Sequence, residues 1–220
     1  MLVSMLASVI ELLTLIRQFG DDPSSFPLLV PIMIGNTDNA TERKLGELLA
    51  PYLVDPSTTF VISSDFAHWG LRFRYTFYRS HRDNEGSMLD ASAKPKNRAI
   101  HESIKEVDFQ CMEACESGSH EAWLDALDGK TVPITAPVYR CTAAAAVEYV
   151  TRLIFVDTGN TVCGRHPIGV IMSAIENVRQ DRQDASQGDG HFEFVRYERS
   201  SEVKKVSESS VSYASAFAVV

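Results

Sequence analysis

The amino-acid sequence predicts an α/β fold in which a central sheet is flanked by helices. Two observations lead to this prediction. An apolar run at residues 26–34, a helical pattern at 39–53 and a β-branched run at 58–63 follow one another closely, in the order of a βαβ unit with a parallel pair of strands. Further amphipathic helical patterns follow downstream. We therefore expect a mixed sheet whose strands are mostly parallel.

The apolar run at residues 26–34 is the first expected strand. It carries two prolines and ends at a Gly-Asn pair, which favours a buried or an edge strand. A helix is expected next, at Asn39–Leu53, and either Asp38 or Asn39 is suited to cap it. The apolar residues of this helix recur at the spacing of one helix face. They are Leu45, Leu48, Leu49 and Tyr52.

The run at residues 58–63 is rich in β-branched residues and is typical of a central strand. It leads directly into the polar residues Ser64, Asp65 and His68. In open α/β sheets, ligands bind beyond the carboxyl ends of the strands. The end of this strand is therefore the first place at which we look for a functional site.

Three more helices and two more strands are expected downstream. The helices are predicted at residues 97–116, 119–127 and 167–180, with Ser119 capping the second and Pro167 in the first turn of the third. The strands are predicted at residues 191–197 and 211–220, and the polar stretches at 79–96 and 183–190 are predicted to be loops.

Residues 1–19 are rich in apolar side chains but carry Glu11 and Arg17. The uncharged stretch is far shorter than the roughly 20 residues that a membrane span needs. A signal peptide would have a basic start and a clear small-residue cleavage site, and neither is present. We interpret this segment as an amphipathic helix that belongs to a larger core.

The composition excludes several classes of protein. The 220 residues include 21 Lys and Arg against 29 Asp and Glu, which gives a net charge of −8 and argues against a nucleic-acid binder. Four cysteines are too few for a disulfide scaffold and favour a reducing compartment. We expect a cytoplasmic protein with no membrane span, and the nucleus remains open as a second location.

Asp65 and His68 lie three residues apart in the segment SSDFAHWG, directly after the strand at 58–63. Outside a helix this spacing lets both side chains converge on one point. Both are good metal ligands and proton-transfer groups. The alternative is a turn with a capping aspartate and a half-buried histidine.

Cys163 and His166 lie in TVCGRHPIG, just before a predicted helix. A thiolate near a helix N-terminus is stabilised and suits a metal ligand or a nucleophile. The alternative is a buried cysteine and a histidine at the helix entry. Together, Cys163, Asp65 and His68 would offer thiolate, imidazole and carboxylate donors, which suit iron, copper or zinc better than magnesium or calcium.

Two further groups have alternative interpretations. Cys111 and Cys115 lie one helical turn apart and are better explained as small buried side chains than as a metal pair. Arginines and aromatic residues alternate directly after the site, where they would suit an anion or a phosphopeptide, or form a solvated strand face. These residues are Arg72, Arg74, Tyr75 and Tyr78.

Three segments resemble the Memo family, which is named for mediating receptor-tyrosine-kinase-driven cell motility and is structurally related to the class III extradiol dioxygenases. They read FVISSDFAHWGLRFRYTFY, NTVCGRHPIGVIMSAIE and SSVSYASAFAV. The resemblance implies a single extradiol-dioxygenase-like domain over residues 1–220, and a pocket like the dioxygenase iron site. In the family, two histidines from the N-terminal half, together with an Asp, a His and a Cys, line that pocket. The matching residues here are Asp65, His68 and Cys163.

The resemblance also implies possible iron or copper binding, redox chemistry and signalling, with a phosphotyrosine peptide or a signalling protein as partner. The alternatives are a non-catalytic phosphopeptide-binding adaptor and an inactive fragment. The sequence begins near the family's middle, so the N-terminal part, with both other histidines, is missing from this chain. His81, His101 and His120 do not replace them. We therefore expect this chain to cleave no catechol and to retain no stoichiometric iron or copper.

Two more positions depart from the family pattern. Ala67 stands where relatives often have a cysteine, which removes a thiol from the pocket. Residues 131–157 match nothing in the family, whose members pass through a short polar link at this point. We interpret this stretch as a non-family insert, encoded by a retained intron or present as a genuine insertion.

Overall fold

The computed structural model of the chain describes residues 2–6, 17, 20, 22–81, 86–95, 97–128, 160–181 and 190–220. The α-helices are α2 (Asn39–Leu53), α3 (Ile100–Glu116), α4 (His120–Leu127) and α5 (Arg165–Asp181). The strands are β1 (Leu2–Leu6), β2 (Phe60–Ser63), β3 (His68–Trp69), β4 (Phe77–Tyr78), β5 (Ser87–Met88), β6 (Glu193–Arg199) and β7 (Ser210–Val219). Two short 3-10 helices, η1 (Pro23–Ser25) and η2 (Leu71–Phe73), complete the described elements.

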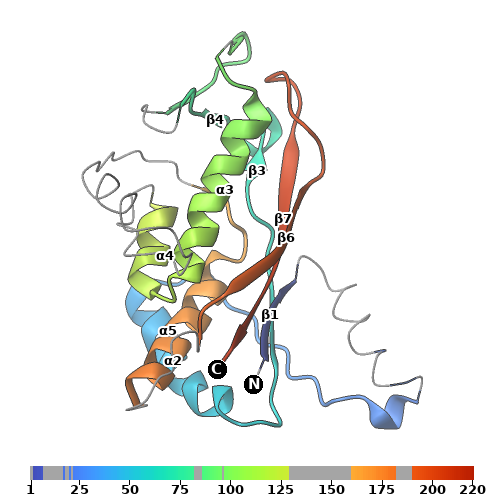
Figure 1. Cartoon of the computed structure of the whole chain (residues 1–220), viewed down its shortest axis with the longest axis vertical. Helices are drawn as coiled ribbons and strands as arrows, with labels where there is room; N and C mark the ends of the chain where they lie inside the picture. Colours follow the sequence, from blue (N-terminus) through green and yellow to red (C-terminus); the bar gives the residue numbers. More distant parts are fainter. Residues whose placement is uncertain are drawn as a thin grey trace, which may run out of the picture.

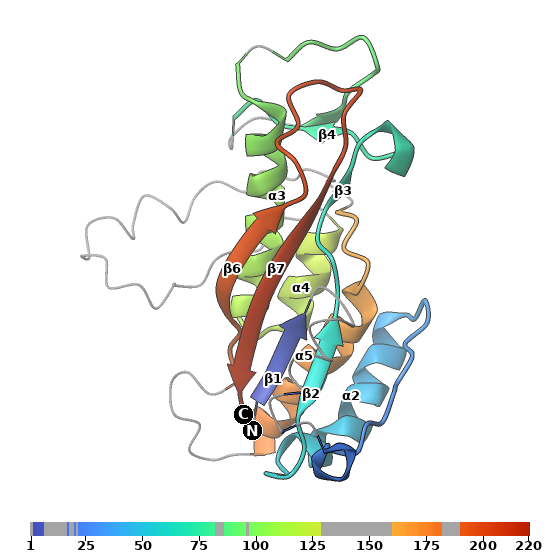
Figure 2. The same ribbon diagram turned by 90° about the vertical axis from the view of Figure 1, so that its right-hand side faces the viewer.

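The main sheet has the strand order β2-β1-β7-β3, and β6 pairs with β7 (Figure 2). β1 runs parallel to β2, with Val3 opposite Phe60, whereas β7 runs antiparallel to β1, β3 and β6. The fold is therefore mixed α/β as predicted, but the prediction of a mostly parallel sheet was wrong. The reason is the long strand β7, whose antiparallel pairings outnumber the single parallel pairing found among the described strands.

The expected βαβ unit exists, but its first strand is β1 and not residues 26–34. That run lies outside every strand, with Leu28 93% and Met33 97% exposed. Its two prolines cannot donate backbone hydrogen bonds to a sheet. The prediction of a helix at residues 1–19 was also wrong for Leu2–Leu6, because pairing with β2 on one side and β7 on the other provides partners for the strand backbone.

The helix α2 has the predicted bounds, and the Asp38 side chain caps it by accepting the Thr41 N–H at 2.8 Å. Its buried face differs from the predicted apolar stripe. Leu48 and Tyr52 are 62% and 57% exposed, and the helix instead buries Glu42, Gly46 and Leu53. Gly46 allows this face of α2 to contact α5 closely, because a Cβ there would lie 2.6 Å from the Ser173 hydroxyl of α5.

The other predicted helices and strands are confirmed with small shifts, but the stretch at 79–96 that was predicted to be a loop contains the two-residue strand β5. Most of the loop predicted at 183–190 lies outside the described residues. Ser119 caps α4 by accepting the Ala122 N–H at 3.2 Å. α5 begins at Arg165, so Pro167 lies in its first turn, where a backbone N–H has no helical partner to lose. The predicted insert at residues 131–157 lies outside the described residues.

The helices α3, α4 and α5 cover one face of the sheet (Figures 1 and 2). The main core lies between these helices and the sheet, and it includes Trp123, Ile168 and Met172, which are all fully buried. Along β7 the side chains alternate between buried and half-buried, so Ala214 and Ala216 face this core. Small residues there let α5 and the neighbouring segments pack close to the sheet.

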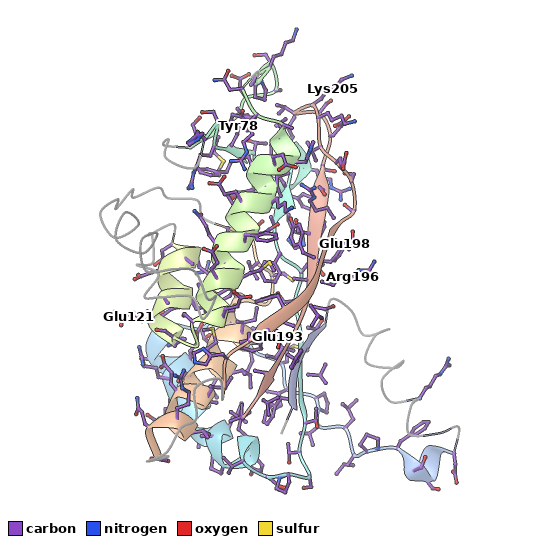
Figure 3. All side chains as sticks on the ribbon, in the orientation of Figure 1. Tyr78, Glu121, Glu193, Arg196, Glu198 and Lys205 are labelled. Atoms are coloured by element: carbon purple, nitrogen blue, oxygen red, sulfur yellow. The ribbon has the colours of Figure 1, made fainter. Side chains whose placement is uncertain are left out.

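The strand β6 carries charged side chains on its exposed positions, apart from the exposed Val195. Figure 3 labels Glu193, Arg196 and Glu198 along this strand, and the last two form an ion pair with a nitrogen–oxygen distance of 3.2 Å. Charged side chains on such a strand disfavour pairing with another chain. These charges disfavour aggregation of the chain through the edge strand β6.

We expect the chain to self-associate through its exposed apolar residues around Leu28 and Met33, since patches of this kind drive association in water. The double variant Leu28→Glu/Met33→Glu should lower the apparent mass at high protein concentration in sedimentation velocity runs. Leu71→Glu, at an exposed leucine elsewhere, is the control. Equal association of all three proteins would contradict the expectation.

Candidate metal centre

Two loops form the site. The first, residues 64–67, leads from β2 to β3, and the second, residues 160–164, leads into α5. Both are tied to the sheet and to each other. Phe66 donates its N–H to Ser212 O at 2.9 Å, Ser212 returns an N–H to Ala67 O at 3.0 Å, and Cys163 donates its N–H to Asp65 O at 3.2 Å. The two loops are therefore held together by backbone bonds.

The three predicted site residues come together. One ligand atom from each of Asp65, His68 and Cys163 lies within 4.8 Å of the other two, and Asp65 Oδ2 is 3.9 Å from His68 Nε2. Among the described residues, these three form the one group of three or more His, Cys, Asp or Glu side chains close enough to share an ion. The three residues singled out from the sequence therefore lie together in the structure.

His68 is oriented by its Nδ1 atom. That nitrogen lies 3.0 Å from both Phe66 O and Thr161 O, and carbonyl oxygens only accept hydrogen bonds. Nδ1 therefore carries a proton, and this orientation turns Nε2 toward Asp65. The backbone adds a further anchor, because His68 N–H donates to Thr161 Oγ1 at 2.7 Å. Fixing the second ring nitrogen in this way is how proteins prepare a histidine ligand.

Cys163 presents an exposed thiol to the same point. Its sulfur accepts the backbone N–H of Asp65 at 3.1 Å, and it lies just before the N-terminus of α5. The sulfur is therefore next to two electropositive groups, the Asp65 N–H and the N-terminus of α5. Asp65 and His68 are only 27% and 23% exposed in their side chains, so solvent reaches the cluster from one side.

His166, the fourth candidate, belongs to a different cluster. Its Nδ1 lies 2.7 Å from Glu42 Oε1, and its Nε2 lies 2.9 Å from Asn36 Oδ1. Glu42 Oε2 accepts a second hydrogen bond from His120 Nε2 at 2.7 Å, while His120 is fully buried and Glu42 only 2% exposed. No local pattern indicated this cluster, because a glutamate in a first helical turn is ordinarily a surface residue.

The electrostatics of Glu42 follow from these contacts. Burial by itself raises the pKa of Glu42, but hydrogen bonds and positive charge from His120 and His166 outweigh it. The net pKa lies below the usual 4.5. His120 Nδ1 has no hydrogen-bond partner among the described residues, so the ring is held through its Nε2 contact with Glu42.

This pairing predicts a loss of stability in acid. Because the folded-state pKa of Glu42 is below 4.5, its contribution is fully present above pH 4.5 and is lost as the pH falls through the folded-state value. The urea midpoint of the wild-type chain should fall more steeply between about pH 5 and about pH 3 than that of Glu42→Gln. Parallel pH profiles of the two proteins would contradict this assignment.

The other residues considered as ligands in the sequence are not grouped around a common point among the described residues. Cys111 and Cys115 are buried, as expected for small core residues, and burial raises the pKa of Cys111 to about 12. Arg72 and Arg74 lie at η2 and are exposed. The Arg72 guanidinium stacks 4.4 Å from the Phe73 ring, which itself contacts the His68 ring at 5.3 Å.

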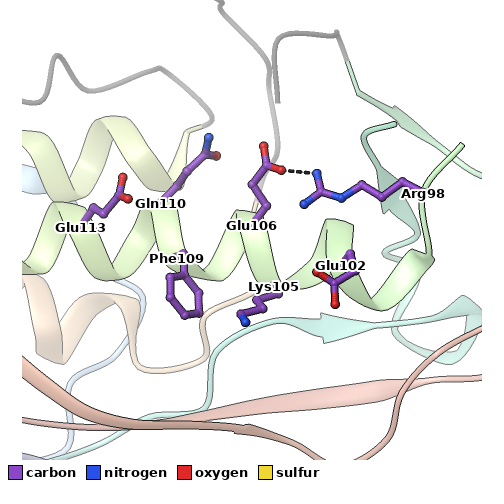
Figure 4. A pocket seen from close by; sticks show the side chains of 7 residues that line it. All are labelled: Arg98, Glu102, Lys105, Glu106, Phe109, Gln110 and Glu113. Carbon is purple, nitrogen blue, oxygen red and sulfur yellow. Dashed lines mark hydrogen bonds and ion pairs between the residues drawn. The ribbon is translucent and has the colours of Figure 1, made fainter. Parts of the chain in front are cut away.

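A shallow groove follows a different face of α3 (Figure 4). An ion pair between Arg98 and Glu106 crosses it, and Lys105 lies 5.3 Å from the Phe109 ring. The groove contains neither histidine nor cysteine, so it does not offer the mixed donors of the cluster. The groove lining is Arg98, Glu102, Lys105, Glu106, Phe109, Gln110 and Glu113.

Comparison with known proteins defines the class. A sequence model described as Memo-like protein matches residues 12–217. The chain is 33% identical over 192 residues to Protein MEMO1 of Danio rerio, covering 87% of this chain and 48% of that protein. It is 32% identical over 186 residues to Protein MEMO1 of Homo sapiens, covering 84% and 46%. A MEMO1 family protein of Schizosaccharomyces pombe is 35% identical over 196 residues, covering 86% and 51%.

The chain belongs to the Memo family. It spans about half the length of the curated relatives that it matches. Among the described residues, no helix is both long enough and apolar enough to cross a membrane.

Proposed function

We propose that this Memo-family chain binds a transition-metal ion through the Asp65 carboxylate, His68 Nε2 and the Cys163 thiolate, in a pocket related to that of the class III extradiol dioxygenases. One observation carries the proposal: three different donor atoms, from the loop at 64–67, the start of β3 and the loop at 160–164, lie within 4.8 Å of one another. The redox-linked role in signalling and cell motility is part of the same proposal and rests on the family resemblance.

The donor set fits such an ion. Sulfur, imidazole and carboxylate donors together suit iron, copper or zinc, whereas magnesium and calcium prefer oxygen alone. Ligands of one tetrahedral ion lie about 3.5 Å apart, since metal–ligand bonds are about 2.0–2.3 Å long. The donor atoms lie within 4.8 Å of one another, so they need to move closer by only about 1 Å to bind one ion.

The chain's own residues would hold and orient the ion. Phe66 O and Thr161 O hold the Nδ1 side of the His68 ring, the Asp65 N–H positions the Cys163 sulfur, and the half-buried Asp65 provides a carboxylate. A bound iron or copper ion would supply Lewis acidity and one-electron redox chemistry. Three protein donors leave coordination positions open to solvent, so we expect measurable but weak binding that does not survive gel filtration.

The test is an equilibrium titration with Co²⁺, whose thiolate complexes absorb strongly in the near ultraviolet. The wild-type chain should develop this band, and His68→Ala and Cys163→Ser should not. His101→Ala, at a half-buried histidine whose ring contacts Val203 O, is the matched control and should keep the band. A wild-type spectrum identical to that of Cys163→Ser would refute the proposal.

The second candidate function is a non-catalytic adaptor that holds a phosphotyrosine peptide at the same pocket. The stacking of Arg72 on Phe73, beside His68, favours this function, because arginine can form bidentate hydrogen bonds with phosphate. A phosphotyrosine peptide should then bind in the presence of a chelator, more tightly than its unphosphorylated form, and Arg72→Gln should abolish the difference. Equal affinity for the two peptides would exclude this function.

A further inference from the structure

A buried aspartate lies directly behind the proposed metal centre. Asp108, on α3, is fully buried, and both of its oxygens are used. Oδ1 accepts the backbone N–H of Ala67 at 3.0 Å, and Oδ2 accepts the Tyr197 hydroxyl at 2.8 Å. Ala67 lies between Asp65 and His68 in the sequence, so this carboxylate anchors the end of the first loop, next to His68.

The second loop reaches the same aspartate. The buried Asn160 is near enough to Asp108 to lower the pKa of that carboxyl, and its amide donates to the Cys111 sulfur at 3.1 Å. Asn160 directly precedes Thr161, whose hydroxyl and carbonyl both hold His68. Asp108 is therefore connected to both loops of the centre through Ala67 and Asn160.

We propose that Asp108 is a positioning residue that fixes the two ligand-bearing loops in the geometry that a metal ion needs. The inference rests on the proposed function, because it concerns the same centre. Asp108 contacts no ligand atom, so it acts through the backbone of Ala67 and through Asn160.

The energetics support a role beyond core filling. Burial raises the pKa of Asp108, since removing a carboxylate from water is unfavourable. An apolar residue would avoid this cost but would leave the buried N–H of Ala67 without an acceptor. A loop with non-helical backbone inside the protein needs such partners. Tyr197 also contacts Ser212 Oγ at 3.2 Å, which connects the network to β7.

The experiment compares Asp108→Ala, Asp108→Asn and the control Ser103→Ala. Ser103 is another fully buried α3 residue whose side chain accepts a backbone N–H, that of Arg79 at 2.8 Å, away from the centre. Two quantities are measured: the Co²⁺ dissociation constant, and amide hydrogen exchange in peptides covering residues 64–69 and 160–164.

Asp108→Ala should weaken Co²⁺ binding by about 10-fold or more, as expected when a supporting partner of a metal ligand is removed. It should also speed exchange in both loops. Asp108→Asn keeps an acceptor for Ala67 and should restore both quantities, and Ser103→Ala should leave both unchanged. If Asp108→Ala does not fold, Tyr197→Phe replaces it, with a smaller effect in the same direction.

Wild-type affinity and loop exchange in Asp108→Ala and Tyr197→Phe would overturn the inference, as would equal effects in Ser103→Ala. A wild-type chain that binds no Co²⁺ defeats the proposed function instead. In that case the exchange data still decide whether Asp108 holds the loops, so the two failures are distinguishable.

Discussion

Replacing Glu42 by alanine should cost about 3 kcal/mol in the free energy of unfolding, because the substitution removes the shared partner of two histidines. His120 is fully buried and would lose its single hydrogen-bonded ring contact, while His166 would keep only Asn36. Glu42→Gln retains an acceptor and should cost less, about 1 kcal/mol.

Urea unfolding followed by circular dichroism measures these values. The control is Glu47→Ala, one turn further along α2 at an exposed position, which should change stability by less than about 0.5 kcal/mol. If Glu42→Ala loses no more stability than Glu47→Ala, the buried cluster does not hold α2, α4 and α5 together.

Gly164→Ala should disrupt the metal centre more than any other single methyl addition. A Cβ at Gly164 would lie 2.4 Å from the Ser64 Cβ, in the loop that carries Asp65, and 2.8 Å from Ser63 O, at the end of β2. The loops must then move apart, which removes the bond from Gly164 N–H to Ser64 Oγ, now 3.0 Å long. We expect a stability loss of about 1–3 kcal/mol.

The loss of Co²⁺ affinity in Gly164→Ala should be about 10-fold or greater, since ligand orientation depends on such support. Gly35→Ala is the matched control, because a Cβ there meets nothing within 4 Å. Unchanged Co²⁺ binding in Gly164→Ala would mean that the close approach of the two loops is not needed for the site.

The candidate centre could be predicted because its residues are local to two short segments. Asp65 and His68 follow a strand directly, and Cys163 directly precedes a helix, so element ends determine where they lie. The cluster of Glu42, His120 and His166 could not be predicted in the same way. Its members come from three helices, and only the packing of α2 on α5 at Gly46 brings them together.

In the sheet, too, the features that depend on neighbouring residues could be predicted, and the pairing of distant segments could not. The helices and the strands β2, β6 and β7 were predictable from their patterns, because periodicity and caps are local. The strand that pairs with β2 could not be predicted, because residues 26–34 and Leu2–Leu6 are similar in composition. The prolines of the first run and the antiparallel partner β7 of the second decide the outcome.

X-ray absorption spectroscopy of the Co²⁺-loaded chain tests the central claim most directly. The account predicts one sulfur at about 2.3 Å from the metal together with nitrogen and oxygen donors at about 2.0–2.2 Å. The sulfur contribution should vanish in Cys163→Ser, and the imidazole contribution should vanish in His68→Ala. A wild-type spectrum with oxygen and nitrogen neighbours alone would contradict the metal centre.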